Sequence, residues 1–176
     1  MFRAIIFILL IFKTTSVFSN GYDVFGIGIY DVKFDGSSSN YATDLRYERR
    51  FDYTLIDIGP EEDNFFYLKP FAGVEFTTDS ALYLISGIYL EDNLGELMIG
   101  KENNWIFTPS FGLGYYDDGN GKKLGNKIEF RTTLEFSYEL DNNDRIGLSF
   151  GHISNANIGN KNPGVEIISL SYQKPF

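Results

Sequence analysis

Three residue types that together can hydrolyse an ester lie close to one another near the end of the sequence. The stretch GHISNANIGNKNPGVE, residues 151–166, contains the only histidine of the chain, His152, together with Ser154 and Glu166. A serine hydroxyl becomes a useful nucleophile when a nearby base takes its proton, and a carboxylate can orient that base. These side chains would form a catalytic group if the fold brings them together.

The composition excludes several classes of protein. The 176 residues suffice for one domain, and the absence of cysteine excludes both a disulfide framework and a thiolate metal site. The net charge is -9 without any basic run, so we expect no nucleic-acid partner. With one histidine and scattered acidic residues, we also expect no metal and no other cofactor. Aromatic residues make up 17% of the chain, which is typical of a membrane barrel with aromatic girdles.

The first residues have the pattern of an export signal. A positive start, Met1 to Arg3, precedes the apolar run AIIFILLIF at residues 4–12, which is too short to span a bilayer as a helix. We expect cleavage after Ser19, which leaves residues 20–176 as the mature domain. The alternative is an uncleaved anchor helix, but Lys13 interrupts the apolar run. Because no other long apolar run follows, the mature chain can reside in a membrane only as strands.

Period-two alternation dominates the rest of the chain and is clearest over residues 126–140. The even positions from Ile128 to Leu140 are mostly apolar, whereas the odd positions from Lys127 to Glu139 carry charges of both signs. Such a strand is long for a soluble sheet but suits a tilted strand that crosses a membrane. We expect residues 96–100 to extend the fourth strand or belong to its loop. The pattern predicts eight strands, at about residues 22–34, 41–51, 65–77, 80–92, 103–117, 126–140, 143–154 and 164–176.

These strands predict an all-β fold, an eight-stranded antiparallel transmembrane β-barrel of the bacterial outer membrane. The last strand alternates up to Phe176, as terminal strands of such barrels do. The alternative is a soluble binding barrel of the lipocalin type, which has an apolar interior and a polar exterior. Closely spaced Asp, Arg and Glu residues on the polar faces fit a narrow lumen better than an exterior.

Side-chain parity and hairpin register place the three chemical residues together. His152 and Ser154 have the parity of the apolar residues of their strand, and Glu166 has that of Ile168 and Leu170, so all three face lipid. A hairpin that closes symmetrically around residues 155–163 puts position 152 opposite 166 and position 154 opposite 164. Directly opposed side chains have Cβ atoms about 4.5–5.5 Å apart, so Glu166 can reach one nitrogen of His152 and Ser154 the other.

Topology then sets the depth of these residues in the membrane. A signal peptide and an even number of strands put both termini on the periplasmic side, so the 155–163 loop is expected to be extracellular. The three residues would lie near the external rim. A histidine and a glutamate at this depth cost little and could also be a simple girdle pair, because polar groups near the interface cost about 0–1 kcal/mol.

The pattern H-x-S-N-A-x(5)-N-x-G-x-E, followed by the alternating strand SLSYQKPF, resembles the outer-membrane lipid A 3-O-deacylase (PagL) family, also described as acyloxyacyl-hydrolase-like. The resemblance implies an eight-stranded barrel with an external triad, in which Ser154 is the nucleophile, His152 the general base and Glu166 its orienting residue. It also implies that Asn155, Asn162 and Gly164 serve the oxyanion site or position the loop. The segment Leu94 to Asn103 departs from the family pattern.

The resemblance implies a serine esterase that removes an ester-linked (3-hydroxy)acyl chain from lipid A in lipopolysaccharide. The partners would then be this lipid substrate and the outer membrane in which the chain resides. Two alternatives stay open: a non-enzymatic small barrel and an acylhydrolase that acts on phospholipid. The acyl position, the preferred chain length and the oligomeric state, including a homodimer, also stay open.

Overall fold

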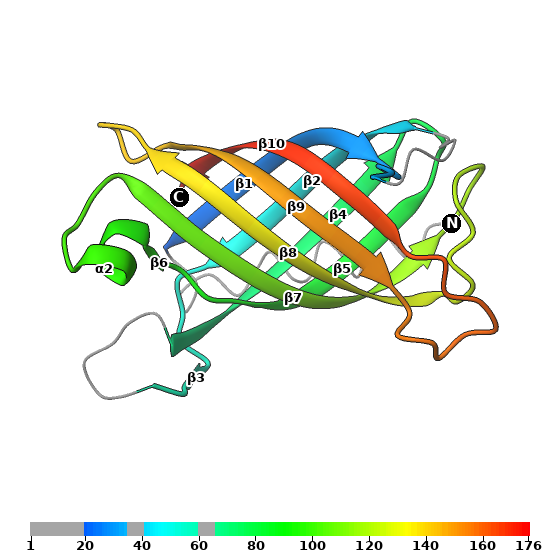
Figure 1. The fold of residues 1–176 in the computed structure, drawn as a ribbon, viewed down its shortest axis with the longest axis horizontal. Helices are drawn as coiled ribbons and strands as arrows, with labels where there is room; N and C mark the ends of the chain where they lie inside the picture. The colour runs from blue at the N-terminus through cyan, green and yellow to red at the C-terminus, as the bar shows by residue number, and fades with distance from the viewer. Residues whose placement is uncertain (1–19, 35–40, 60–65) are drawn as a thin grey trace.

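The computed structural model describes residues 20–34, 41–59 and 66–176, so the expected signal peptide of residues 1–19 lies outside the described part. Eight long strands alternate in direction and form one sheet (Figure 1). Compared with the prediction, the first strand stops earlier because Asp31 takes a left-handed backbone conformation, with φ 62°. The strands are β1 (Gly21–Tyr30), β2 (Ala42–Phe51), β4 (Tyr67–Thr77), β5 (Leu82–Tyr89), β7 (Trp105–Asp117), β8 (Ile128–Glu139), β9 (Arg145–Ser154) and β10 (Val165–Pro175).

The sheet closes on itself. β1 pairs with both β2 and β10, and the additional pairing of β2 with β4 completes the ring. All pairings are antiparallel, which confirms the predicted eight-stranded antiparallel barrel. Closure satisfies the backbone hydrogen bonds of every long strand without an open edge, as a strand protein in a bilayer requires.

The two ends of the barrel differ. We call the end where β1 begins at Gly21 and β10 ends at Pro175 the terminal end, and it carries three connections. The opposite end, which we call the site end, carries the connection of residues 155–164 between β9 and β10 (Figure 1). The short strands β3 (Ile56–Asp57) and β6 (Asp92–Asn93) lie in two of the terminal-end connections.

Of the two alternatives for residues 96–100, the structure has the loop and not a strand extension, and the helix α2 (Leu94–Ile99) lies in this loop at the terminal end. The Asn93 side chain accepts hydrogen bonds from the backbone of Gly95 and Glu96, and Gly100 ends the helix in a left-handed conformation. These are the capping contacts that favour one helical turn over an extended chain. Within the described residues, no helix is long and apolar enough to span a bilayer.

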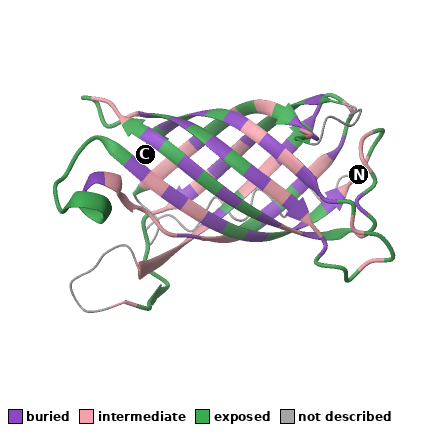
Figure 2. Cartoon of the chain, viewed as in Figure 1, coloured by how far each residue is buried: buried purple, intermediate pink, exposed green. Residues whose placement is uncertain are grey.

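The outer wall is apolar. Exposed and buried residues alternate along most of the long strands, most regularly in β8 and β9, and Figure 2 shows this as diagonal bands. At the terminal end, Trp105 packs against Tyr138 with ring centroids 5.3 Å apart, as in an aromatic girdle. This exterior is the reverse of a lipocalin-type barrel. Exposed apolar side chains of the wall include Phe25, Ile27, Leu45, Phe76, Leu84, Leu113, Leu134, Phe136, Leu148 and Leu170.

Most of the charged side chains in the lumen are paired with one another. Glu135, which is fully buried, accepts hydrogen bonds from Arg50 at 2.7 Å, Arg46 at 3.0 Å and Gln173 at 2.7 Å. Arg131 donates to Glu75 at 2.6 Å and also to Glu48. Buried charges are tolerated when each is paired in this way. The predicted polar lumen is therefore confirmed.

Toward the site end the lumen gives way to buried aromatic and aliphatic side chains. The hydroxyl groups of Tyr30 and Tyr116 lie 2.8 Å apart, and Tyr116 also donates to the Lys122 carbonyl at 2.8 Å. Leu124 and Ile153 pack in the same cluster. Side chains therefore fill the interior here, and a large ligand is left with the outer wall.

Candidate active site

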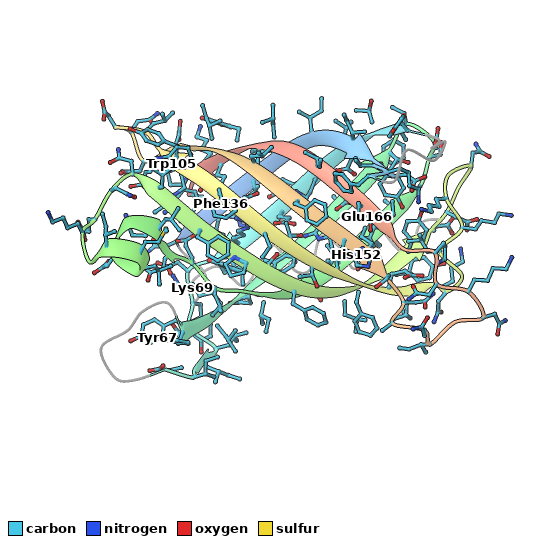
Figure 3. The ribbon with its side chains drawn as sticks, viewed as in Figure 1. Tyr67, Lys69, Trp105, Phe136, His152 and Glu166 are labelled. Carbon is cyan, nitrogen blue, oxygen red and sulfur yellow. The ribbon has the colours of Figure 1, made fainter. Side chains whose placement is uncertain are left out.

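His152 and Glu166 form a pair on the outer wall near the site end. They are direct partners in the pairing of β9 with β10, which confirms the predicted register. His152 Nδ1 lies 3.2 Å from Glu166 Oε1, and the two side chains are 45% and 30% exposed. Figure 3 shows them side by side on neighbouring strands, pointing away from the lumen.

Ser154 follows His152 on the same face of β9. The residues between and beside them, Ile153 and Gly151, are buried, so Ser154 and His152 share the outward parity. In the described part of the chain, the His152–Glu166 contact is the one hydrogen bond that joins members of this group. The bond of a serine to its base often tightens only when a substrate binds.

Gly164 lets the loop approach the imidazole closely. Its φ is 59°, and a Cβ atom added there would lie 2.9 Å from His152 Cε1. Any larger residue would therefore strain the backbone and push against the ring. This supports the expected positioning role of Gly164.

The two candidate asparagines have different environments. Asn162 Oδ1 accepts a hydrogen bond from the Asn155 backbone N–H at 3.0 Å, which leaves the Asn162 amide group to donate elsewhere. Asn155 is fully buried, and its amide nitrogen donates to the carbonyls of Leu124 at 2.9 Å and Lys161 at 2.7 Å. Asn155 thus holds two loops together, whereas the Asn162 amide group keeps its donors for other partners.

Two further residues, which were not predicted from the sequence, flank the site from β8. Thr132 pairs with His152, and Phe130 pairs with Ser154. Phe130 stacks on Phe111 with ring centroids 5.9 Å apart, so an aromatic wall begins beside the serine. The symmetry of the β8–β9 hairpin around residues 140–144 is the signal that could have found both.

A second aromatic contact joins the chain beyond β1 to β9, across the strand β10 that lies between them. Phe34, beyond the end of β1, lies with its ring centroid 6.1 Å from that of Phe150 on β9, and both rings are exposed. Phe150 precedes His152 by one outward position. The group is therefore bordered by aromatic surface on both sides, as expected for a site that holds an acyl chain.

The described residues contain no group of three or more His, Asp and Glu side chains placed to hold a metal ion. The arrangement that is present, an imidazole with a carboxylate on one nitrogen and a serine on the same face, has the composition of a nucleophile, base and orienting group.

The sequence matches a family model over residues 87–175, and that model describes lipid A 3-O-deacylase (PagL). The match includes all of β7 to β10, and with them the six candidate site residues. The chain is also similar to the lipid A deacylase PagL of Bordetella bronchiseptica, with 36% identity over 55 residues. That alignment spans 31% of this chain and 31% of the relative.

Solved structures share the fold. The crystal structure of the outer membrane enzyme PagL aligns with a TM-score of 0.64 at 16% identity, covering 88% of this chain and 99% of that one. A de novo designed transmembrane β-barrel aligns with a TM-score of 0.54 at 12% identity, covering 91% and 98%. These likenesses show the fold. The chain belongs to the lipid A 3-O-deacylase (PagL) family of bacterial outer-membrane β-barrels.

Proposed function

We propose that this chain is a serine esterase that removes the ester-linked (3-hydroxy)acyl chain at the 3-position of lipid A in the outer leaflet. The observation that carries the proposal is the His152–Glu166 pair at 3.2 Å on the outer wall, on the same face as Ser154. A girdle pair alone would not need a serine at this position or a glycine packed against the imidazole. Family membership names the substrate class.

The first half of the reaction forms an acyl-enzyme. The Glu166 carboxylate accepts the Nδ1–H of His152 and thereby leaves the Nε2 lone pair to take the Ser154 proton. The Ser154 Oγ attacks the ester carbonyl carbon and gives a tetrahedral oxyanion. When this intermediate collapses, the bond from the carbonyl carbon to the sugar oxygen breaks, and the sugar oxygen takes the proton from His152.

The second half releases the fatty acid. Water attacks the acyl carbonyl, His152 takes its proton, and the proton returns to Ser154 as the acyl bond breaks. In both halves the Asn162 amide would donate to the oxyanion, since its carbonyl oxygen is anchored by the Asn155 backbone. Losing one such donor typically costs about 100–1000-fold in rate.

An external site suits this substrate. We place the site end outside the cell, so that Ser154 lies at the level of the outer leaflet, where lipid A diffuses along the barrel wall. The aromatic surfaces that border the site would hold the acyl chain, while the filled lumen excludes it. The active unit is expected to be the single barrel, since all named groups come from one chain.

Mass spectrometry of lipid A tests the proposal. The full chain is expressed in an outer membrane whose lipid A is fully acylated, and we expect the loss of one 3-hydroxyacyl chain from the 3-position. Ser154→Ala and His152→Ala should abolish this loss while the barrel still folds. Ser86→Ala is the matched control, because Ser86 is another exposed serine of the outer wall, on β5.

Other outcomes would contradict the proposal in different ways. If lipid A is unchanged but the purified protein cleaves phospholipid, the chain is an acylhydrolase with another substrate. If the folded protein cleaves neither lipid, it is a non-enzymatic barrel. If Ser154→Ala keeps full activity, a different residue is the nucleophile.

A further inference from the structure

Two lysines share one carboxylate beside the candidate site. Lys33 Nζ lies 3.6 Å from Asp31 Oδ1, and Lys122 Nζ contacts the same oxygen. Asp31 is buried, and its side chain is only 9% exposed. The side chains of Lys33 and Lys122 are 25% and 19% exposed. The three charges sum to +1, although the chain as a whole carries -9.

The backbone brings this cluster next to Glu166. The Val32 N–H donates to the Glu166 carbonyl at 3.0 Å, so the chain beyond β1 stays in register with β10. Lys33 follows Val32 directly and therefore lies at the same end of the barrel as Glu166. β10 lies between β9 and β1, so the distance from β9 to the end of β1 is two strand spacings, on the order of 10 Å. This distance is comparable with the size of one phosphorylated sugar unit.

Lys122 reaches this position because its loop folds over the barrel. The Tyr116 hydroxyl holds the Lys122 carbonyl at 2.8 Å, and the buried Leu124 and Asn155 hold the rest of the loop. Lys122 is thus presented by a packed segment rather than by a free loop tip. Lys127, in contrast, is neutralised by Asp117 at 3.1 Å and Asp118 at 3.5 Å.

The cluster of Lys33, Lys122 and Asp31 carries more positive than negative charge. Each ammonium has three donors, and a single carboxylate oxygen cannot satisfy two such groups. Burial is the main cause that lowers the pKa of Lys122, and the neighbouring Lys33 adds to this. A phosphate group would supply up to two negative charges and three acceptor oxygens, which are the complements of two lysines beside one aspartate.

We propose that Lys33 and Lys122, held together by Asp31, bind a phosphate group on the sugar of the lipid substrate. The inference rests on the proposed function and adds a subsite to it. The phosphate would anchor the sugar on the β1 side of Glu166 while the ester reaches Ser154. Phosphorylated lipid should then bind more tightly than the same lipid without phosphate.

Binding to the full chain in the Ser154→Ala background tests the subsite without turnover. The probes are a 2,3-diacylated glucosamine 1-phosphate and the same lipid without phosphate, titrated in uncharged detergent micelles by calorimetry. We expect the phosphorylated lipid to bind at least about tenfold more tightly, as for charge-assisted contacts. Lys33→Gln and Lys122→Gln should each reduce this preference to about twofold and leave the affinity for the unphosphorylated lipid unchanged.

Control variants distinguish a phosphate subsite from a general loss of lipid binding. Lys127→Gln should keep the full preference, and Lys122→Arg should restore most of it, which also tests whether the loop still folds. If both glutamine variants keep the preference, or weaken both lipids equally, the subsite is wrong. If micelles with phosphatidylglycerol compete as well as the phosphorylated sugar, the cluster binds a phospholipid headgroup and the sugar-phosphate assignment fails.

Failure of the subsite and failure of the proposed function have different signatures. A chain with Ser154 intact that hydrolyses no lipid A contradicts the function, while the binding preference can still be measured. A chain that hydrolyses lipid A while both glutamine variants keep the binding preference contradicts only the subsite.

Discussion

Charged pairs occur in two regions of this barrel, the lumen and the outer wall near the site end, and they differ in how completely they are satisfied. In the lumen, Glu135 is fully buried and accepts from two arginines and further polar groups. On the wall, His152 and Glu166 share one contact at 3.2 Å and keep 45% and 30% of their exposure.

This difference indicates a structural role for the lumen pairs and a chemical role for the wall pair. A buried carboxylate whose oxygens are all engaged has no capacity left for a substrate, and its role is to fill the lumen without an unpaired charge. The wall pair leaves one imidazole nitrogen uncommitted at a surface that lipid can reach. Charge alone therefore does not mark the site, whereas incomplete pairing at an accessible position does.

The largest expected effect comes from breaking the wall pair. Glu166→Gln should lower kcat on lipid A by about 1000-fold or more, because the amide can no longer stabilise the imidazolium or select the tautomer. The urea midpoint, followed by fluorescence of the single Trp105, should stay nearly unchanged. A kcat within tenfold of the wild type would contradict the orienting role.

Breaking the contacts of Glu135 in the lumen should lower the stability of the barrel and leave kcat unchanged. Glu135→Leu leaves Arg46 and Arg50 without their shared acceptor and should lower the free energy of unfolding by about 3–5 kcal/mol. Urea titration with Trp105 fluorescence measures this, and the kcat of the folded fraction should be preserved.

Glu139→Gln is the matched control, since Glu139 also lies on β8 and pairs with Arg145 at 2.9 Å but is 33% exposed. It should cost about 1 kcal/mol or less. Equal losses in both variants would refute the contrast between buried and exposed pairs.

The two asparagines sharpen the comparison within the site itself. Asn162→Ala should reduce kcat by about 100-fold with little change in KM, because it removes a donor needed only in the transition state. Asn155→Ala should instead lower the free energy of unfolding by about 1–3 kcal/mol, since the carbonyls of Leu124 and Lys161 lose a buried partner. If Asn155→Ala alone lowers kcat while stability is unchanged, the two roles are reversed.

The smallest effect is expected at the rim. The backbone N–H of Gly119, followed by Lys127, lowers the pKa of Asp117. A lowered folded-state pKa means that the stabilisation is present above pH of about 4 and is lost as the pH falls through the folded-state pKa. Asp117→Asn should thus shift the thermal midpoint by about 1 °C at pH 7 and not at pH 2, as measured by Trp105 fluorescence.

Much of the fold and part of the site could be predicted because they depend on local patterns. Alternation with period two identifies the strands and their lipid-facing side, since neighbouring side chains point to opposite faces. The short β9–β10 connection limits the register, so the opposition of His152 and Glu166 followed from symmetry. The helix α2 was missed because its stability comes from a cap by Asn93, which a short apolar run does not reveal.

The sequence by itself thus determined the barrel, the outward face of Ser154 and the pairing of His152 with Glu166. Only the tertiary structure decided that Asn155 is committed to Leu124, and that Lys33 and Lys122 meet at Asp31. The physical reason is distance along the chain. Contacts between directly opposed residues of one hairpin follow from side-chain alternation, whereas contacts between separate loops exist only after the strands that carry those loops have paired.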